Sequence, residues 1–468
     1  MNETHNVSLL KRVHCIGLGG IGVSAVAKLL KARGVIVTGS DKAETDTLTE
    51  LKSRRIKYWI GSHPEKMGRN LDLVVYSSAV PDDDEERVRA RHLGVREVSY
   101  NAFLGELARE YKRVVAVTGT HGKSTTTAML GHVLIEGGAN PTVVVGSKVP
   151  TFKAGNLHLG ARELFVAEAC EYQAHMLELK PDIIVLTNVE FDHPDYYRDV
   201  NHVRETMKMF VERLPKDGVL IWNTNDEHSR LLIESLDFAP TLVGVGDDGD
   251  LSATVEHAAG RQTMHVHWQG AHIGDVVLRL PGEHNVMNAL MASAAASVLG
   301  MKGEAIKEAI ESFPGLWRRF EHLGMFQGAD MYADYAHHPT ALERLLEGTR
   351  TFLPNRRIVL CFQPHQQART LGLLDEFVGS MDEADVVNLP EIYGVGGRDD
   401  GAKAISSEDV AAKIEEHDVA RHAKRTVTFT KDFVETERVL KQEVRKGDVL
   451  LMVGAGDIDA FARALAAR

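Results

Sequence analysis

Residues 114–131, VVAVTGTHGKSTTTAMLG, decide the fold of the central part of this chain. The β-branched run at 114–118 predicts a buried strand, residues 119–122 a loop, and residues 124–135 a helix. A strand that enters a helix through a glycine-rich loop offers backbone N–H groups to a phosphate. The common nucleotide loop G-x-x-x-x-G-K-[ST] has glycine where this chain has Val117. The shorter loop disfavours generic switch and motor NTPases, although a phosphate cradle is still expected.

The loop residues have different tasks in holding a triphosphate. Lys123 neutralises the β- and γ-phosphates, and the Ser124 hydroxyl can reach Mg²⁺. The other loop positions that can surround the phosphates are Gly119, Thr120, His121, Gly122 and Thr125. A Gly-Lys-Ser sequence can also follow a strand by chance, so the motif needs support from other residues.

Composition indicates an α/β protein with several domains. At 468 residues the chain exceeds one compact core and suggests about three domains. The net charge of −12 argues against a nucleic-acid partner, because phosphate backbones favour a basic face. Three widely spaced cysteines in or beside apolar runs predict buried thiols in a reducing compartment. With no cleavable leader and no apolar run of ~20 residues, we expect a cytoplasmic protein without a membrane partner.

Short β-branched runs alternate with helical patterns, which predicts βαβ units and parallel sheets. A charged helical stretch ends near Glu110, and a segment with Pro and Gly begins near Pro314. We therefore expect an α/β fold of three domains. They are a Rossmann-like domain at 1–110, a central P-loop ATPase-like domain with a parallel sheet at 111–314, and a second Rossmann-like domain at 315–468. Between 239 and 280, short alternating segments predict a small antiparallel excursion.

A second glycine-rich loop follows the first predicted strand. Residues 17–22, GLGGIG, fit the pattern G-x-G-x-x-G, and Asp41 ends the next predicted strand. The backbone of such a loop can approach a diphosphate at a helix N-terminus, where the helix dipole favours anions. By itself the motif indicates a diphosphate rather than one molecule. NAD is the default ligand, while another diphosphate compound and a purely structural tight turn stay open.

Polar residues also follow two predicted strands of the central domain. Glu168 ends the strand in VAEACEYQ, and Asp192 and His193 follow the strand in TNVEFDHPD. Ligands gather at the carboxyl ends of parallel strands, so these groups can converge with Lys123. Carboxylate oxygen suits Mg²⁺, and a histidine suits a second divalent ion. Taken singly, Glu168 and His193 are more typical of surface or structural positions; with the phosphate loop they predict a metal site that includes Ser124.

Two further groups flank the second domain boundary. Asn285 and Asn288 lie near one face of a predicted helix N-terminus and can read a purine edge, although helix capping by Asn285 explains the pattern equally well. Arg318 and Arg319 lie just past the boundary. One of them can move onto a γ-phosphate when the domains close and neutralise its charge.

A polar cluster follows a strand in the C-terminal domain. The segment YADYAHHPT carries Asp334, His337 and His338 immediately before a predicted helix. Histidines beside a carboxylate can exchange protons with a substrate. A solvated turn is the alternative explanation.

Taken in order, these stretches resemble the Mur ligase family, the ATP-dependent amide-forming enzymes of peptidoglycan precursor synthesis. The short loop G-T-x-G-K-[ST] is standard in that family, which accounts for the absent glycine. The similarity runs over nearly the whole chain and includes GLGGIGVSAVAKLL, AVTGTHGKSTTTAML, VAEACEYQ, TNVEFDHPDYY, GEHNVMNA, GLWRRFE, DYAHHPT, FQPHQQARTLGLLDEF and GAGDI.

The resemblance implies a reaction and a role for each candidate residue. The reaction uses ATP with Mg²⁺ or Mn²⁺ to join L-alanine to the lactyl carboxylate of UDP-N-acetylmuramate through an acyl phosphate. The N-terminal domain then binds the UDP-sugar instead of NAD, through Gly17, Gly19, Gly20, Gly22, Asp41, Ser77 and Ser78. ATP is assigned to the loop with Asn285, Asn288 and Asp334, catalysis to Lys123, Arg319, His337 and His338, metal binding to Ser124, Glu168 and His193, and the amino-acid side to His365, Arg369 and Thr370.

Some positions depart from the alanine-adding members of the family. Those members read EADESD where this chain reads EACEYQ, so Cys170 and Gln173 replace acids while Glu168 and Glu171 remain. EYQ and VEFDH are closer to a sister ligase that attaches an intact tripeptide, whereas FQPHQQARTLGLLDEF resembles the alanine-adding members, apart from Gln366 in place of a common arginine. A tripeptide ligase is the alternative within the family, and an NAD-dependent oxidoreductase is the alternative outside it. We expect only small-molecule partners and a monomer or homodimer.

Overall fold

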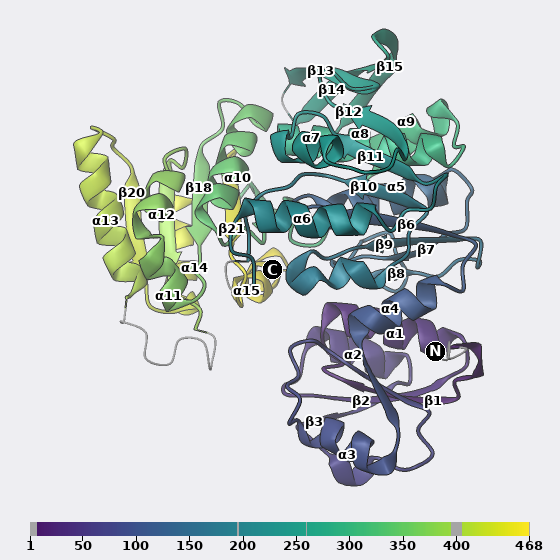
Figure 1. Cartoon of the computed structure of the whole chain (residues 1–468). Helices are drawn as coiled ribbons and strands as arrows, with labels where there is room; N and C mark the ends of the chain where they lie inside the picture. The colour runs from purple at the N-terminus through teal and green to yellow at the C-terminus, as the bar shows by residue number, and fades with distance from the viewer. Residues whose placement is uncertain (1–6, 194–195, 259, 395–404, 468) are drawn as a thin grey trace. The chain divides into compact units, whose positions relative to one another are not determined.

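The computed structural model describes residues 7–193, 196–258, 260–394 and 405–467. These residues form three β-sheets of five, ten and six strands, each accompanied by helices (Figure 1). The α/β fold class with three domains is confirmed. Within the described residues, no helix combines the length and the apolar character that crossing a membrane requires.

The five-stranded sheet is parallel throughout and has the order β3-β2-β1-β4-β5. The chain leaves β1 to one side and returns on the other, so the loop after β1 lies at the position where doubly wound sheets bind ligands. The edge strands β3 and β5 are less buried than the inner strands, since β3 has no buried residue and β5 has one. The elements are η1 Val7–Leu9, β1 Arg12–Ile16, α1 Ile21–Ala32, β2 Ile36–Asp41, α2 Asp46–Ser53, β3 Lys57–Ile60, η2 Pro64–Lys66, β4 Leu73–Tyr76, α3 Glu85–Leu93, β5 Arg96–Ser99 and α4 Tyr100–Ala108.

The ten-stranded sheet has the order β15-β14-β13-β12-β11-β10-β6-β9-β7-β8. Strand β6 lies between β9 and β10 and is parallel to both, so the phosphate loop that follows β6 lies at the switch point of this sheet. The elements are β6 Arg113–Thr118, α5 Lys123–Glu136, β7 Thr142–Val144, β8 Leu157–His158, β9 Leu164–Glu168, η3 Tyr172–Glu178, β10 Ile183–Leu186, α6 Val200–Val211, β11 Val219–Asn223, α7 Glu227–Glu234, β12 Thr241–Val245, β13 Leu251–Ala258, β14 Arg261–Trp268, β15 Ala271–Leu278, α8 Glu283–Val298 and α9 Gly303–Ser312.

The segment at 239–280 differs in one respect from the expected excursion. Strand β12 pairs in parallel with β11, and β13, β14 and β15 follow in the same sheet. Strands β13 to β15 are successive neighbours in the sheet, and β14 and β15 are joined by the two residues Gln269 and Gly270, a connection typical of antiparallel hairpins. The antiparallel strands therefore extend the central sheet, because the open edge of β12 offers unpaired backbone groups to the next strand.

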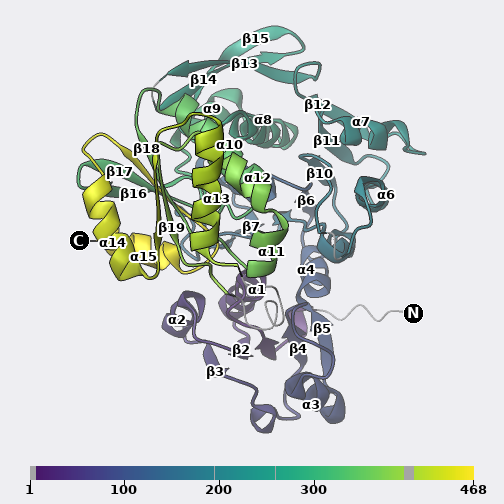
Figure 2. The same ribbon diagram turned by 90° about the vertical axis from the view of Figure 1, so that its left-hand side faces the viewer.

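The six-stranded sheet has the order β16-β17-β21-β18-β19-β20, and only the β16–β17 pair is antiparallel among the pairs of this sheet. Helices lie on both faces of this sheet (Figure 2). The elements are β16 Glu321–Phe326, β17 Ala329–Asp334, α10 Pro339–Phe352, β18 Ile358–Phe362, α11 Gln367–Gly372, α12 Leu374–Ser380, β19 Val386–Pro390, α13 Ser407–Ala420, β20 Thr426–Thr430, α14 Phe433–Glu443, β21 Val449–Val453 and α15 Ile458–Ala466.

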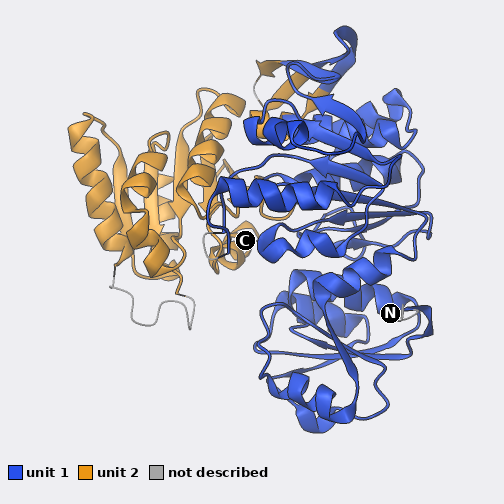
Figure 3. Ribbon diagram, in the orientation of Figure 1, with its two compact units in different colours: residues 1–254, 265–276, 287–314 blue, residues 255–264, 277–286, 315–468 orange. Residues whose placement is uncertain are grey.

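The chain divides into two compact units (Figure 3). The first comprises residues 1–254, 265–276 and 287–314, and the second comprises residues 255–264, 277–286 and 315–468. The first two sheets fall in one unit because one apolar core joins them: Val13 and Leu30 from the first sheet region belong to the same buried cluster as Val114 and Leu186 from the central sheet. The second unit has separate buried clusters on the two faces of its own sheet.

Candidate active site

The phosphate loop requires glycine at two of its four positions. Gly119 has φ 132° and Gly122 has φ 82°, a region that a Cβ atom disfavours. A Cβ on Gly119 would also overlap the Thr187 hydroxyl, and one on Gly122 would overlap the amide oxygen of Asn288. By contrast, Val117 is a fully buried residue of β6 that pairs with Glu168 of β9. The position that lacks the usual glycine is therefore part of the strand, and the loop starts later.

Lys123 begins helix α5 and folds back over the loop. Its Nζ donates to the carbonyl oxygens of Gly119 at 2.7 Å and Thr120 at 2.8 Å, and it lies 2.7 Å from Oε2 of Glu171. Burial alone would lower the pKa of Lys123, but the Glu171 carboxylate raises it above its ordinary value. The lysine is therefore held as a cation at the loop that is expected to receive phosphate.

Glu171 was noted in the sequence as a retained acid of EACEYQ but was not assigned to the site. Its side chain is 2% exposed and lies between Lys123 and His193, whose Nε2 is 3.4 Å from Glu171 Oε1. The Tyr197 hydroxyl donates to the Glu171 carbonyl oxygen. Burial would raise the pKa of Glu171, but Lys123 and His193 together bring it below its ordinary value. The available signal was the second acid in EACEYQ, which follows the end of β9 by three residues.

Ser124 and Glu168 bring two hard oxygen atoms together beside the loop. The Ser124 hydroxyl donates to Glu168 Oε1 at 3.0 Å, and the Gly146 backbone N–H donates to Glu168 Oε2 at 2.7 Å. Hydroxyl and carboxylate oxygens are the donor types that Mg²⁺ prefers. These two residues fit the magnesium ion expected beside the phosphates.

His193 reaches the phosphate site through Glu171. Its backbone has φ 56°, its ring lies 4.7 Å from the Tyr172 ring between centroids, and its side chain is about one-third exposed. The hydrogen bond to Glu171 raises the pKa of His193. The structure thus groups His193 with Lys123 and Glu171, whereas Glu168 is held by Ser124 and Gly146.

The two asparagines of helix α8 behave differently. The Asn288 side chain accepts a hydrogen bond from the Thr126 hydroxyl at 3.1 Å, which connects α8 to the phosphate-loop helix α5. The Asn285 amide instead donates to the Pro281 carbonyl oxygen at 2.7 Å, just before its own helix. This bond is local but is not a helix cap, because Asn285 lies inside the first turn of α8 and donates, whereas a capping side chain accepts from backbone N–H groups.

The N-terminal glycine loop forms a second cradle, at the carboxyl ends of β1, β2 and β4. The Gly19 backbone N–H donates to Asp41 Oδ2 at 2.7 Å. Gly17 has φ 77°, and a Cβ there would stand 2.9 Å from the Cβ of Ser77. Gly20 donates to the Gly17 carbonyl oxygen at 3.1 Å, which closes the turn. The structure therefore brings these predicted residues together.

Gly22 and Ser78 complete that set. Gly22 lies in the first turn of α1, and a Cβ there would press against the ring of Tyr100. The glycine thus allows close packing of α1 against α4, which is a structural role. Ser78 is exposed immediately after Ser77.

In the second unit, Asp334 ends β17 and holds two backbone groups. Its Oδ2 accepts from the Phe320 N–H and its Oδ1 from the Ala336 N–H, both at 2.8 Å. Burial raises the pKa of the Asp334 carboxyl, while nearby Arg319 opposes that rise. Asp334 pairs with Val453, which in turn pairs with Phe362 at the end of β18, so the loops after these three strands meet at one edge of the sheet.

The structure distinguishes the two neighbouring arginines. Arg318 is buried, donates to the Gly454 carbonyl oxygen and lies 3.9 Å from Asp459. Arg319 is exposed, with its guanidinium carbon 5.6 Å from the centre of the Tyr335 ring. Arg318 is therefore held by contacts within its own unit, whereas Arg319 is the exposed member of the pair.

His337 and the residues after β18 form a group near Asp334. The His337 Nδ1 lies 3.1 Å from the Tyr335 carbonyl oxygen, and its ring is 6.1 Å from that of His365. Burial lowers the pKa of His337 to about 4. His365 stacks on Tyr393 with 5.6 Å between ring centroids, and Arg369 NH1 lies 3.5 Å from His365 Nδ1.

Two predicted residues stand apart from that group. Thr370 is buried and its hydroxyl donates to the Gln366 carbonyl oxygen at 2.8 Å, which is a helix-internal bond of α11. His338 is exposed at the start of α10. Tyr393 was not singled out in the sequence, because it lies about thirty residues from His365 and no local motif connects the two.

Three family models match consecutive parts of the chain. The Mur ligase family catalytic domain matches residues 12–112, the Mur ligase middle domain residues 117–296, and the Mur ligase glutamate ligase domain residues 318–456. A UDP-N-acetylmuramate–L-alanine ligase of Clostridium novyi (strain NT) is 36% identical over 449 residues, which cover 96% of this chain and 95% of that protein. This chain belongs to the Mur ligase family.

Solved structures agree with the placement of this chain among the Mur ligases. The crystal structure of the UDP-N-acetylmuramate–alanine ligase MurC from Thermotoga maritima has a TM-score of 0.83 and 29% identity, and the match covers 98% of this chain and 99% of that one. A murein peptide ligase from Psychrobacter arcticus 273-4 has a TM-score of 0.68 and 24% identity, with 97% and 98% covered, and shares the fold.

The EACEYQ departure leaves the phosphate site of this Mur ligase with two acids. Glu168 and Glu171 hold Ser124 and Lys123 respectively. Cys170 lies between them in the chain, and burial raises the pKa of its thiol to about 11. The Cys170 thiol is therefore protonated and uncharged at pH 7, unlike the carboxylate that it replaces.

Proposed function

We propose that this Mur ligase joins L-alanine to the lactyl carboxylate of UDP-N-acetylmuramate, with conversion of ATP to ADP and phosphate. The observation that carries the proposal is the full-length similarity to ligases named for this reaction, together with a phosphate loop that holds Lys123 as a cation. The similarity favours L-alanine over an intact tripeptide. An NAD-dependent oxidoreductase would leave Lys123, Glu168 and Glu171 without a purpose.

The loop and its neighbours are the proposed ATP site. Backbone N–H groups of 119–125 surround the phosphates, and Lys123 exchanges its loop carbonyl partners for phosphate oxygens. Asn285, Asn288 and Asp334 are proposed for the nucleotide. Mg²⁺ held by Ser124 and Glu168 would supply charge stabilisation to the transferred phosphoryl group. His193 is the proposed additional ligand, and Mn²⁺ suits the same donors.

The first chemical step forms an acyl phosphate. A lactyl carboxylate oxygen attacks the γ-phosphorus, the bond to the β–γ bridging oxygen breaks, and ADP leaves. Lys123 spreads the charge of the transferred group, and Arg319 is proposed to do the same, since it is the exposed member of its arginine pair. Water must be excluded at this stage, because an acyl phosphate hydrolyses.

The second step forms the amide. The amine of L-alanine attacks the acyl carbon, and phosphate leaves from the tetrahedral intermediate. His337 is partly buried and its lowered pKa leaves it neutral at pH 7, so its imidazole can accept a hydrogen bond from the incoming amine, while His338 is exposed. His365, Arg369 and Thr370 are the proposed amino-acid side, where the guanidinium suits a carboxylate.

The UDP-sugar is assigned to the N-terminal cradle. Close backbone approach at Gly17, Gly19 and Gly20 suits a diphosphate, and Asp41 and Ser77 border the same loop. Gly22 and Ser78 belong to this proposal as well. ATP and a nucleotide sugar are small-molecule substrates of the cytoplasm, where we expect the protein to act as a monomer or homodimer without nucleic-acid or membrane partners.

A single assay of ADP release tests this function. The full chain receives ATP, Mg²⁺ and UDP-N-acetylmuramate with one of L-alanine, glycine, L-serine or the intact tripeptide. We expect ADP release that requires both the UDP-sugar and an amino acid, with L-alanine giving the highest kcat/KM. Faster turnover with the tripeptide would transfer the assignment to the recycling reaction, and ADP release without either co-substrate would reject the ligase.

A further inference from the structure

The hairpin β14–β15 carries a group of imidazoles that the proposed reaction does not use. Within eleven residues, 265–275, the chain places His265, His267, His272 and Asp275. Strand β15 is the edge strand of the central sheet and lies five positions from β10. Strands β14 and β15 are joined by Gln269 and Gly270, both with positive φ, as in a tight type I′ hairpin turn.

Strand β14 separates its apolar and polar residues cleanly. Met264 and Val266 are buried, while His265 and His267 alternate with them and lie on the other face. An alternating strand of this kind needs no histidine for its packing, since the core face is already supplied. The two imidazoles are therefore available to the outer surface of the hairpin.

Strand β15 is bent so that two side chains meet on that surface. Residues three apart in a regular strand point to opposite faces, so His272 and Asp275 would ordinarily diverge. Between them Gly274 has φ 149°, a conformation that favours glycine, and its surroundings leave open space. The irregular backbone at Gly274 brings His272 and Asp275 to the same side.

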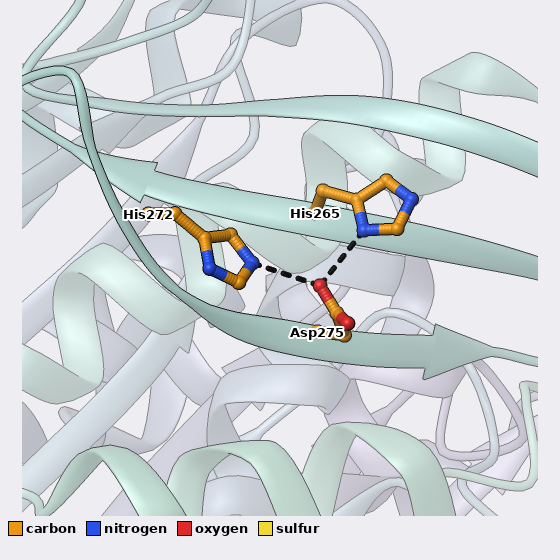
Figure 4. A group of neighbouring side chains, drawn as sticks. All are labelled: His265, His272 and Asp275. Carbon is orange, nitrogen blue, oxygen red and sulfur yellow. Dashed lines mark hydrogen bonds and ion pairs between the residues drawn. The ribbon is translucent and has the colours of Figure 1, made fainter.

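The side chains converge on one carboxylate oxygen (Figure 4). Asp275 Oδ1 lies 2.8 Å from His265 Nδ1 and 2.8 Å from His272 Nε2. Potential ligand atoms of the three residues all lie within 4.8 Å of one another. The ring of His267 stands 5.4 Å from that of His272 between centroids. The side chains of His265, His272 and Asp275 are one-third to one-half exposed, so an ion can enter from solvent.

We propose that His265, His272 and Asp275 form a surface site for one Zn²⁺ ion that pins β14 to β15. Two imidazole nitrogens and one carboxylate oxygen are a common protein ligand set for zinc, with water in the remaining position. Bond lengths of about 2.0–2.1 Å in a tetrahedron separate neighbouring ligand atoms by roughly 3.3 Å. Zinc binding therefore requires the two 2.8 Å contacts to lengthen, and the two imidazole nitrogens, which lie within 4.8 Å of each other, to reach the same spacing.

The donor set distinguishes this site from the one beside the phosphate loop. Hard oxygens from Ser124 and Glu168 suit Mg²⁺, whereas imidazole nitrogen suits zinc and its neighbours in the transition series. Excess Mg²⁺ should therefore occupy the former without displacing zinc from the hairpin. The proposed ion is structural and does not depend on the ligase reaction.

Equilibrium dialysis of the full chain against Zn²⁺ in excess Mg²⁺ tests the proposal. We expect His272→Asn and Asp275→Asn each to lose one zinc equivalent relative to wild type, or to bind it at least about tenfold more weakly. Mutation of a residue that only hydrogen-bonds a metal ligand already lowers metal affinity by about tenfold or more, and loss of a ligand itself should cost no less. The matched control is His322→Asn. That histidine is 49% exposed and lies 3.1 Å from a single aspartate, Asp330, on another sheet.

Cobalt provides a second, spectroscopic readout, and the variants assign its signal to the hairpin. Co²⁺ added to wild type should give the visible absorption of a nitrogen- and oxygen-ligated ion, and this signal should be lost in His272→Asn and kept in His322→Asn. Far-ultraviolet circular dichroism checks that the variants remain folded. Equal zinc stoichiometry and affinity in wild type, His272→Asn and Asp275→Asn would overturn the proposal and leave a hydrogen-bonded cluster.

Discussion

At the residue scale, the candidate phosphate site contains a largely buried ion pair between Lys123 and Glu171. Lys123 is 13% exposed and Glu171 2% exposed, and each stabilises the ionised form of the other. His193 adds a second contact to the same carboxylate at 3.4 Å. The glutamate and the two loop carbonyl oxygens therefore determine the position of Lys123.

Replacement of Glu171 by glutamine should destabilise the protein clearly. The amide keeps the shape but leaves Lys123 as a buried cation without its counter-charge, and loss of one partner of a buried pair costs on the order of 3 kcal/mol. Urea unfolding followed by circular dichroism measures the effect. The control is Glu163→Gln, whose pair with Lys112 is 65–74% exposed and contributes about 0–1 kcal/mol. Equal midpoints for both variants would contradict the prediction.

The partly buried ring of His337 predicts a specific pH dependence. Burial lowers its pKa to about 4, whereas an unfolded histidine titrates near 6.5. Between these values the unfolded chain binds a proton that the folded chain does not, so the contribution of His337 to stability is present above pH 6.5 and is lost as the pH falls towards 4. A histidine ring signal that is absent in His337→Asn should titrate near pH 4 by NMR. A midpoint near 6.5 for that signal would show that the ring is solvated.

At the element scale, strand order determines which side chains meet. The loop after β6 lies between the ends of β9 and β10, so Glu168 and the segment that leads to His193 approach it from opposite sides. The alternation of apolar runs predicted these strands correctly. It did not predict the edge strands β3 and β5, because few of their side chains are buried. Nor did it show that β13 to β15 continue the central sheet, since register depends on distant partners.

The turn from β6 into α5 should tolerate no side chain at Gly122. A Gly122→Ala substitution places a Cβ at φ 82° against Asn288, and the backbone strain alone costs about 1–2 kcal/mol. Gly138→Ala is a matched control, because its φ is 85° and nothing lies within 4 Å of the added atom. We expect a larger drop in the urea midpoint for Gly122→Ala, and partial recovery in Gly122→Ala combined with Asn288→Ala. Similar midpoints for the two single variants would refute the steric argument.

At the scale of the whole molecule, the proposed substrates are assigned to different sheets. The glycine cradle follows β1 of the five-stranded sheet, and the phosphate loop follows β6 of the ten-stranded sheet. Arg319 and His337 belong to the six-stranded sheet of the second unit. On this proposal ATP and the UDP-sugar bind on different sheets, and ADP release is expected only when all substrates are present.

Lys123→Ala should therefore separate binding from turnover. The variant loses the cation expected at the γ-phosphate, so ADP release should fall by at least a factor of about 100, a magnitude typical for removal of one charge-stabilising group. Its affinity for UDP-N-acetylmuramate, measured by calorimetry, should stay close to that of wild type because Lys123 lies on another sheet from the glycine cradle. ADP release at the wild-type rate would reject the assignment of Lys123.

The sequence by itself determined the order of strands and helices around each glycine-rich loop and the family, and it predicted a phosphate site at residues 119–124. These features are local, because backbone N–H groups, glycine conformations and apolar periodicity are carried by neighbouring residues. Only the tertiary structure decided that Glu171 joins Lys123 to His193, that Arg318 is buried while Arg319 is exposed, and that Gly274 brings His272 to Asp275. Those facts depend on register and burial, which arise when segments far apart in the chain pack together.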